Sequence, residues 1–211
     1  NFYGTDSHKI DSFVEKEMKK YLGTKFFYYK RKTPLNEFHM SKSKNIAHLF
    51  GLETINFKNL FKPYECTDYI FNLDCDNILN GDEYNIVNNN KNIDLLRFST
   101  VNLNLKKLHS DKWDGTSGRL CIKSGCFKKL NGYNENLDFF GCDEVELILR
   151  IIKYKYKFKN IIIDSKSKNF IENKLSELEE KNRNNSNKTN YRNIEKFVNN
   201  PSLKFEEKKY N

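Results

Sequence analysis

The chain has 211 residues, enough for one domain with a substantial core, whereas two independent domains would be small. Its 37% hydrophobic and 14% aromatic residues exclude an intrinsically disordered chain. The formal net charge of +9 suggests an anionic partner, but the lysines are scattered among acids without a nucleic-acid-binding motif. We therefore rank a nucleic-acid binder last, and a phosphate-bearing small ligand stays open.

The cysteines and the apolar runs bear on location. No C-x-x-C pair occurs and the cysteine count is odd, so we expect reduced, mostly buried thiols and a cytoplasmic protein. No apolar run is long enough to cross a membrane. The Asn- and Lys-rich composition is typical of an AT-rich genome, including that of a large virus. Because the chain begins with Asn1, we expect it to be part of a longer polypeptide.

The first quarter of the chain predicts two helices and a strand. Thr5-Asp6-Ser7 is typical of a helix start, and apolar residues at helical spacing follow it as far as Gly23. Residues 25–30, KFFYYK, predict a short aromatic strand. A second, shorter helix is expected to carry Ile46 and to end at Gly51.

The middle of the chain alternates strands with helices, which predicts an α/β fold with a mixed, mostly parallel sheet flanked by helices. We expect a core over residues 1–164 and a polar, helical extension over 165–211. The predicted strands are 68–74, 94–99, 118–124 and 158–164, and the helices between them are 81–89 and 143–155.

Two aspartates, Asp74 and Asp76, follow the predicted strand 68–74 directly. Ligands of open α/β sheets bind beyond the carboxyl ends of strands, and two adjacent carboxylates repel each other unless a cation lies between them. Hard oxygen ligands suit Mg²⁺ or Mn²⁺, with diphosphate oxygens completing the shell. The alternative is that both aspartates cap the next turn.

A second acidic group, Asp143, Glu144 and Glu146, opens the predicted helix 143–155. Acids are common in the first helical turn, so a structural role is an alternative to chemistry. The preceding loop, NGYNENLDFFG (131–141), is rich in Gly, Asn and aromatic residues, which favours binding of a polyhydroxyl ligand.

A basic group and a lone tryptophan complete the candidate residues. Lys42, Lys44 and Asn45 enter a predicted helix, a position that suits a phosphate, although a solvated basic face explains them equally well. His39 and His48 are expected to be structural or surface residues. Trp113, the only tryptophan, fits either a sugar-stacking platform or a core position.

The order of these motifs resembles that of GT-A-fold glycosyltransferases, especially family-two enzymes and the C-terminal region of the β-1,4-galactosyltransferases. The resemblance covers about residues 3–155. The segments that carry it, in chain order, are YGTDS (3–7), KNIA (44–47), DCD (74–76), LNGYNE (130–135), GCDEVEL (141–147) and Arg150.

The resemblance implies a transfer of a sugar from a nucleotide-sugar donor, such as a UDP-sugar, to a hydroxyl of a glycan, protein or lipid, with inversion. Mn²⁺ or Mg²⁺ would lie on Asp74 and Asp76. The general base would be Glu144 by position, or Asp143, since the acidic pair stands in the reverse of the family's order. Donor-binding residues would be Asp6, Lys44, Asn45 and Asp74, and acceptor-binding residues would be Trp113, Tyr133, Asn134 and Gly141.

Three features differ from the family pattern. The first acid of the N-terminal loop is replaced by NFYG, and the strand–helix–strand unit expected before it would precede Asn1. No histidine follows His109, so Asp164 or an asparagine would replace the family's downstream metal ligand. The alternatives are an inactive sugar- or nucleotide-binding module of a larger protein and, ranked lower, a nucleotidyltransferase.

Overall fold

The computed structural model describes residues 39–51, 69–73, 81–99, 119–137 and 141–163, and isolated positions at 16, 20, 181, 185, 188–190, 192 and 194. The chain divides into two compact units, residues 1–38 and 39–211, and every element described below belongs to the second unit. The predicted strand 25–30 and most of the predicted first helix lie outside the described residues.

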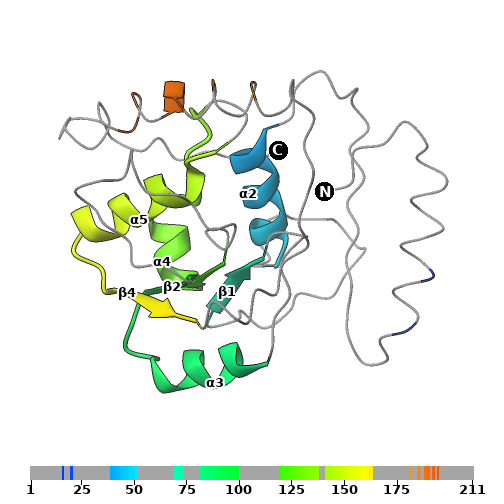
Figure 1. The fold of residues 1–211 in the computed structure, drawn as a ribbon, viewed down its shortest axis with the longest axis vertical. Helices are drawn as coiled ribbons and strands as arrows, with labels where there is room; N and C mark the ends of the chain where they lie inside the picture. The colour runs from blue at the N-terminus through cyan, green and yellow to red at the C-terminus, as the bar shows by residue number, and fades with distance from the viewer. Residues whose placement is uncertain are drawn as a thin grey trace. The chain divides into compact units, whose positions relative to one another are not determined.

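Four strands form one mixed sheet in the order β1-β3-β2-β4 (Figure 1). Strand β3 (Leu120–Lys123) is antiparallel to both β1 (Tyr69–Asn72) and β2 (Leu95–Ser99), whereas β2 is parallel to β4 (Phe158–Ile162). The prediction of a mixed sheet is therefore confirmed. Three strands run in one direction, but "mostly parallel" does not describe the described pairings: inserting β3 between β1 and β2 makes two of the three pairs antiparallel.

The strands are mostly apolar, and together they bury side chains on both faces of the sheet, as strands between two helical layers do. One face carries a core of Ile70, Leu95, Leu120 and Ile122. The other face buries Leu96, Phe98 and Cys121. Every residue of β2 is buried, so this strand shows no alternation of polar and apolar residues.

Four helices flank the sheet: α2 (Met40–Gly51), α3 (Asp82–Asn89), α4 (Ser124–Lys129) and α5 (Asp143–Lys153). Helices α4 and α5 cover the first face through Phe127, Leu147 and Ile151, and α3 packs Ile86 and Val87 against the second face (Figure 1). The strands and helices predicted within the described ranges are confirmed, with bounds that move by a few residues.

One end of the first face is polar. Asn72 in β1, Arg97 and Ser99 in β2 and Asn160 in β4 lie toward the end where the three co-directional strands finish. Arg97 is buried and donates from Nη1 to Asn160 Oδ1 at 2.9 Å. The carboxyl ends of these strands therefore meet in a polar region, which is where ligands of α/β sheets bind.

Two described residues of the C-terminal part contact the turn before α5. Ile194 is buried with Leu137 and Cys142, and the fully buried Asn190 donates from Nδ2 to the carbonyl of Gly141 at 3.0 Å. The segment predicted as a polar extension thus contributes core contacts beside the start of α5.

Two predictions from the sequence are met within the described residues. Cys121, Cys126 and Cys142 are buried, and burial raises the pKa of the Cys121 thiol to about 12. Among the described helices, none combines the length and apolarity that a membrane crossing requires. Cys66 and Cys75 lie outside the described residues.

Candidate active site

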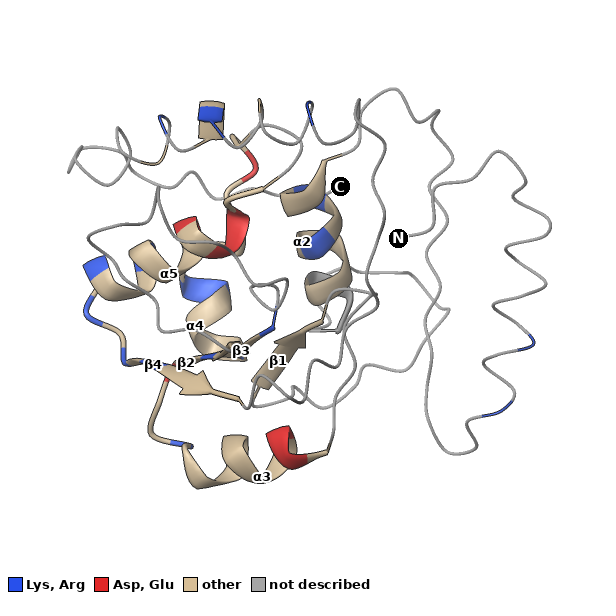
Figure 2. Cartoon of the chain, in the orientation of Figure 1, with Lys and Arg blue, Asp and Glu red and all other residues tan. Residues whose placement is uncertain are grey.

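Helices α2 and α5 bring Lys44 together with Asp143 and Glu144, about a hundred residues away in sequence. Lys44 Nζ lies 2.8 Å from Asp143 Oδ2 and also forms an ion pair with Glu144 Oε1. Figure 2 shows the acidic first turn of α5 and the basic residues of α2 as separate coloured segments of the fold. We call these three residues the Lys–Asp–Glu group.

The group lies toward the polar end of the sheet. Helix α5 ends at Lys153 and β4 begins at Phe158, so the helix runs back against β4 and its first turn lies toward the strand's carboxyl end. From α2, His48 hydrogen-bonds the side chain of Asn72, the last residue of β1. The chain then leaves the sheet two positions before Asp74 in the sequence.

The two carboxyl groups have opposite pKa shifts. Burial raises the pKa of Asp143 to about 7, and the neighbouring Glu144 adds to this, while Lys44 opposes it. Burial also acts to raise the pKa of Glu144, but Lys44 and a hydrogen bond with Asp143 outweigh it and lower that pKa. One group therefore holds a proton near neutral pH and the other is ionised, the division that acid–base chemistry uses.

The turn before α5 has an unusual backbone conformation. Gly141 and Cys142 both adopt positive φ, 89° and 65°, which is uncommon for the non-glycine residue Cys142. No side chain caps the helix. Asn190 instead donates a hydrogen bond to the Gly141 carbonyl. It thereby holds the turn that directly precedes Asp143 and Glu144.

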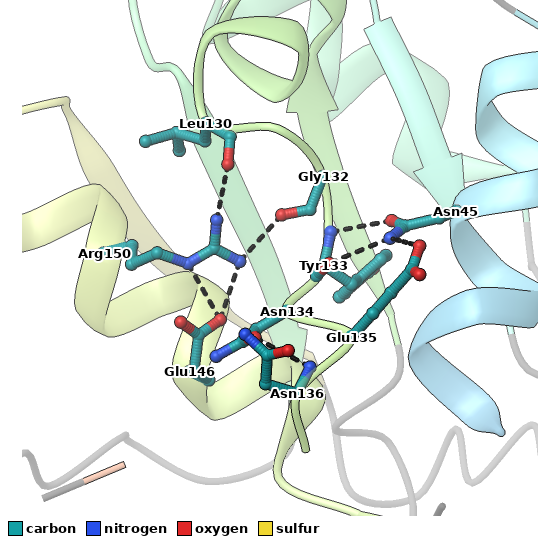
Figure 3. Close-up of polar contacts among 9 residues, drawn as sticks. All are labelled: Asn45, Leu130, Gly132, Tyr133, Asn134, Glu135, Asn136, Glu146 and Arg150. Carbon is teal, nitrogen blue, oxygen red and sulfur yellow. Dashed lines mark hydrogen bonds and ion pairs between the residues drawn. The ribbon is translucent and has the colours of Figure 1, made fainter. Parts of the chain in front are cut away.

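Arg150 fastens the loop 130–137 to α5 (Figure 3). Its Nη1 donates to the Leu130 carbonyl at 2.6 Å and its Nη2 to the Gly132 carbonyl at 2.7 Å. Glu146, one turn earlier, accepts from Arg150 Nε at 2.8 Å, and both side chains are almost completely buried. Burial raises the pKa of Glu146 against the effect of Arg150.

Asn45 fastens the same loop to α2 (Figure 3). Its Nδ2 donates to Tyr133 O at 2.8 Å and to Glu135 Oε1 at 2.9 Å, and its Oδ1 accepts from Tyr133 N at 2.7 Å. His39 Nε2 is 3.0 Å from the Glu135 carbonyl. The loop is therefore held between the two helices that supply the Lys–Asp–Glu group.

Gly132 is required by this loop. Its φ is +68°, and an added Cβ would lie 2.4 Å from Asn45 Oδ1. We expect Gly132→Ala to lower the free energy of unfolding by about 2 kcal/mol or more, through backbone strain and loss of the Asn45 bonds. The matched control is Gly125→Ala in α4, where φ is not positive and nothing lies within 4 Å, so the expected change is small. Equal losses of stability in urea unfolding of the two variants would contradict this.

Tyr133 and His48 belong to the core. Tyr133 is 2% exposed, and its ring stacks on His48 at 5.9 Å and meets Phe127 edge-on at 5.7 Å. Burial lowers the pKa of His48 to about 4, so the imidazole is neutral at physiological pH. The expectation that His48 is structural agrees with this. Tyr133, predicted to bind the acceptor, has its ring packed against His48 of α2 and Phe127 of α4.

The structure places several other predicted residues in contacts of their own. Lys44 is 7% exposed and pairs with acids, so it does not lie on a solvated basic face. The Asn45 amide holds the loop, and Asn134 Oδ1 accepts from Asn136 N at 3.0 Å in a turn. Asp6, Asp74, Asp76 and Trp113 lie outside the described residues, so their predicted roles stay predictions.

Sequence reasoning missed the partners that fix the loop. Glu146 and Arg150 stand four residues apart on one helix, a spacing that signals an ion pair but not its burial. Nothing in the sequence pattern pointed to the bond from Asn190 to Gly141.

No family model matches the chain, and neither a curated protein nor a solved structure is similar to it. What the fold and site define is thus a class: an α/β protein with an open mixed sheet and a buried carboxyl pair at the start of a helix.

Proposed function

We propose that this chain carries the core of a metal-dependent glycosyltransferase that moves a sugar from a nucleotide-sugar donor, such as a UDP-sugar, to an acceptor hydroxyl with inversion. The observation that carries the proposal is the Lys–Asp–Glu group, whose carboxyl pair lies toward the polar carboxyl ends of the strands. The order of sequence motifs around it supports the same conclusion.

The proposed chemistry needs a carboxylate that is ionised at neutral pH. A carboxylate at the start of α5 would take the proton of an acceptor hydroxyl as its oxygen bonds to the anomeric carbon of the donor. The bond from that carbon to the diphosphate breaks, and its electron pair leaves with the nucleoside diphosphate. Attack opposite the leaving group inverts the anomeric configuration.

Asp74 and Asp76 are the residues proposed to hold the metal. Their carboxylate oxygens suit Mn²⁺ or Mg²⁺, and β1 leads the chain to them from the polar end of the sheet. Diphosphate oxygens would complete the shell of an ion held by these two carboxylates. The bound ion would supply charge stabilisation to the leaving diphosphate.

A thermal-shift panel of nucleoside diphosphates and their sugars, with Mn²⁺ or with EDTA, tests the donor site. We expect one nucleotide to raise the Tm by several degrees with Mn²⁺, since a ligand at 100 times its Kd adds about 2.7 kcal/mol of stability. The shift should vanish with EDTA and in Asp76→Ala, while Asp82→Ala, an exposed aspartate of α3, should keep it.

Three outcomes bear on the proposal differently. A shift that survives EDTA and Asp76→Ala would argue against the metal site. Metal-dependent binding without release of nucleoside diphosphate from any donor would favour the inactive sugar- or nucleotide-binding module. A flat panel would contradict the donor site altogether.

A further inference from the structure

The Lys–Asp–Glu group has one cation for two acids. The side chains of Lys44, Asp143 and Glu144 are 7%, 3% and 12% exposed. A buried carboxylate is stable when a cation compensates it, and a second ionised carboxylate beside the first is costly. The described geometry therefore favours a state in which only one of the two acids is ionised.

No charged group described around the Lys–Asp–Glu group supplies it with a second cation. Along α5, Glu146 and Arg150 form their own pair, with 2.6 Å between Glu146 Oε2 and Arg150 Nη2. On α2, His48 is neutral. From the loop, Glu135 adds a negative charge and Tyr133 places its ring 5.6 Å from Lys44 Nζ.

The other neighbours that the structure describes bring no compensating charge either. His39 on α2 is bound to a loop carbonyl and faces Glu135. The C-terminal segment contributes the uncharged Asn190 beside Gly141, while its described basic residues, Lys181, Lys188 and Arg192, are exposed.

We propose that Lys44 is a positioning residue that holds Asp143 and Glu144 as a pair sharing one proton, with the proton on Asp143 and the negative charge on Glu144. Two observations support this: Lys44 forms ion pairs with both carboxyl groups, and the side chain of Glu144 is more exposed than that of Asp143, 12% against 3%. The opposite pKa shifts of the two acids agree with it.

This assignment names the base of the proposed transfer, and in that step alone it rests on the proposed function. Glu144 accepts the acceptor proton, because it is ionised and is the more exposed of the two acids, while Asp143 keeps its own proton and donates a hydrogen bond to Glu144. Lys44 touches neither the substrate nor the transferred proton in this scheme. It lowers the free energy of the ionised form.

Carboxyl-carbon NMR of the Asp- and Glu-labelled protein, without nucleotide or metal, tests the shared proton. We expect one carboxyl titration near pH 7 that disappears in both Asp143→Asn and Glu144→Gln, because either change leaves one acid for one ammonium ion. A titration that persists unchanged in Glu144→Gln would show a solitary buried acid and overturn the proposal, as would two acids that are both ionised at pH 6.

The role of Lys44 has its own variants. Lys44→Met should move the titration up by about one to three pH units, and Lys44→Arg should restore its position. The matched control is Lys123→Met in β3. It removes the 3.0 Å ion pair between Lys123 and Asp94 and should leave the titration in place. No movement in Lys44→Met would overturn the role of Lys44, and where that variant does not fold, Lys44→Arg and Glu144→Gln decide.

The NMR titration tests the shared proton, and the transfer assay tests the proposed function, so each proposal can be contradicted without the other. A shared proton without nucleotide binding or transfer would remove the proposed function and leave the pair. Transfer whose kcat depends on Glu144 but not on Lys44, at any pH, would keep the function and remove the positioning role.

Discussion

Replacing Arg150 by methionine is expected to lower the free energy of unfolding by about 3–5 kcal/mol. The guanidinium compensates the buried Glu146 and donates to the carbonyls of Leu130 and Gly132, all with almost no exposure to water (Figure 3). Without it Glu146 either keeps a charge that burial disfavours or takes up a proton, which costs free energy at neutral pH because a free glutamate is ionised there. Urea unfolding monitored by circular dichroism measures the loss.

Two further variants separate the buried charge from the general effect of removing an arginine. Arg192→Met replaces an exposed arginine and should change stability by no more than about 0.5 kcal/mol. The double variant Glu146→Leu, Arg150→Met removes both charges and should regain part of the loss, since an apolar pair of similar volume replaces a buried ion pair well. A double variant no more stable than Arg150→Met would show that the loop carbonyls, not Glu146, account for the cost.

Asp143→Asn is expected to make the protein more stable than the wild type at pH 8 and about equally stable near pH 4. The folded-state pKa of Asp143 is about 7 and its unfolded value is 3.8, so between these pH values the folded protein binds more protons. The stability that Asp143 contributes therefore falls as pH rises from about 4 to 7 and then stays constant. The difference between the two curves should reach on the order of 2–4 kcal/mol.

Asp94→Asn is the control of opposite sign. Burial acts to raise the pKa of Asp94, but bonds from the Lys157 amide at 2.8 Å and from Lys123 at 3.0 Å outweigh it and lower that pKa. This carboxylate stabilises the fold above its unfolded pKa, and the contribution is lost as pH falls through its lowered folded pKa. Thermal unfolding from pH 4 to 8 should thus show Asp94→Asn less stable than the wild type at neutral pH. Parallel curves for Asp143→Asn and the wild type would contradict the raised pKa of Asp143.

The sequence by itself determined the local elements within the described ranges. Strand β2 is a run of apolar residues broken by one arginine, and α5 combines helical spacing with acids in its first turn, so their conformations follow from nearest neighbours and periodicity. It also placed acids at the first turn of α5. These are properties of segments shorter than a dozen residues, and no tertiary contact was needed to recognise them.

The pairing of strands and the partners of charges were decided only by the tertiary structure. β3 lies between β1 and β2, although β2 precedes it in the chain, and this order places Ile122 of β3 opposite both Ile70 of β1 and Leu95 of β2 in one core. Lys44 looked like a phosphate ligand in the sequence, since a helix start and a positive charge suit either a phosphate or an acid. Only the packing of α2 against α5 shows that its partners are Asp143 and Glu144.

Tyr133 and Arg150 show the same limit. The Gly-, Asn- and aromatic-rich composition of the loop favoured binding of a polyhydroxyl ligand. In the structure, Asn45 and Arg150 hydrogen-bond the loop to α2 and α5, and the Tyr133 ring is buried in the core. Charge and polarity are read from a single residue, whereas burial depends on residues far away in the chain. The sequence could therefore name the chemical groups of this site, and the tertiary structure alone set which of them are paired, protonated or enclosed.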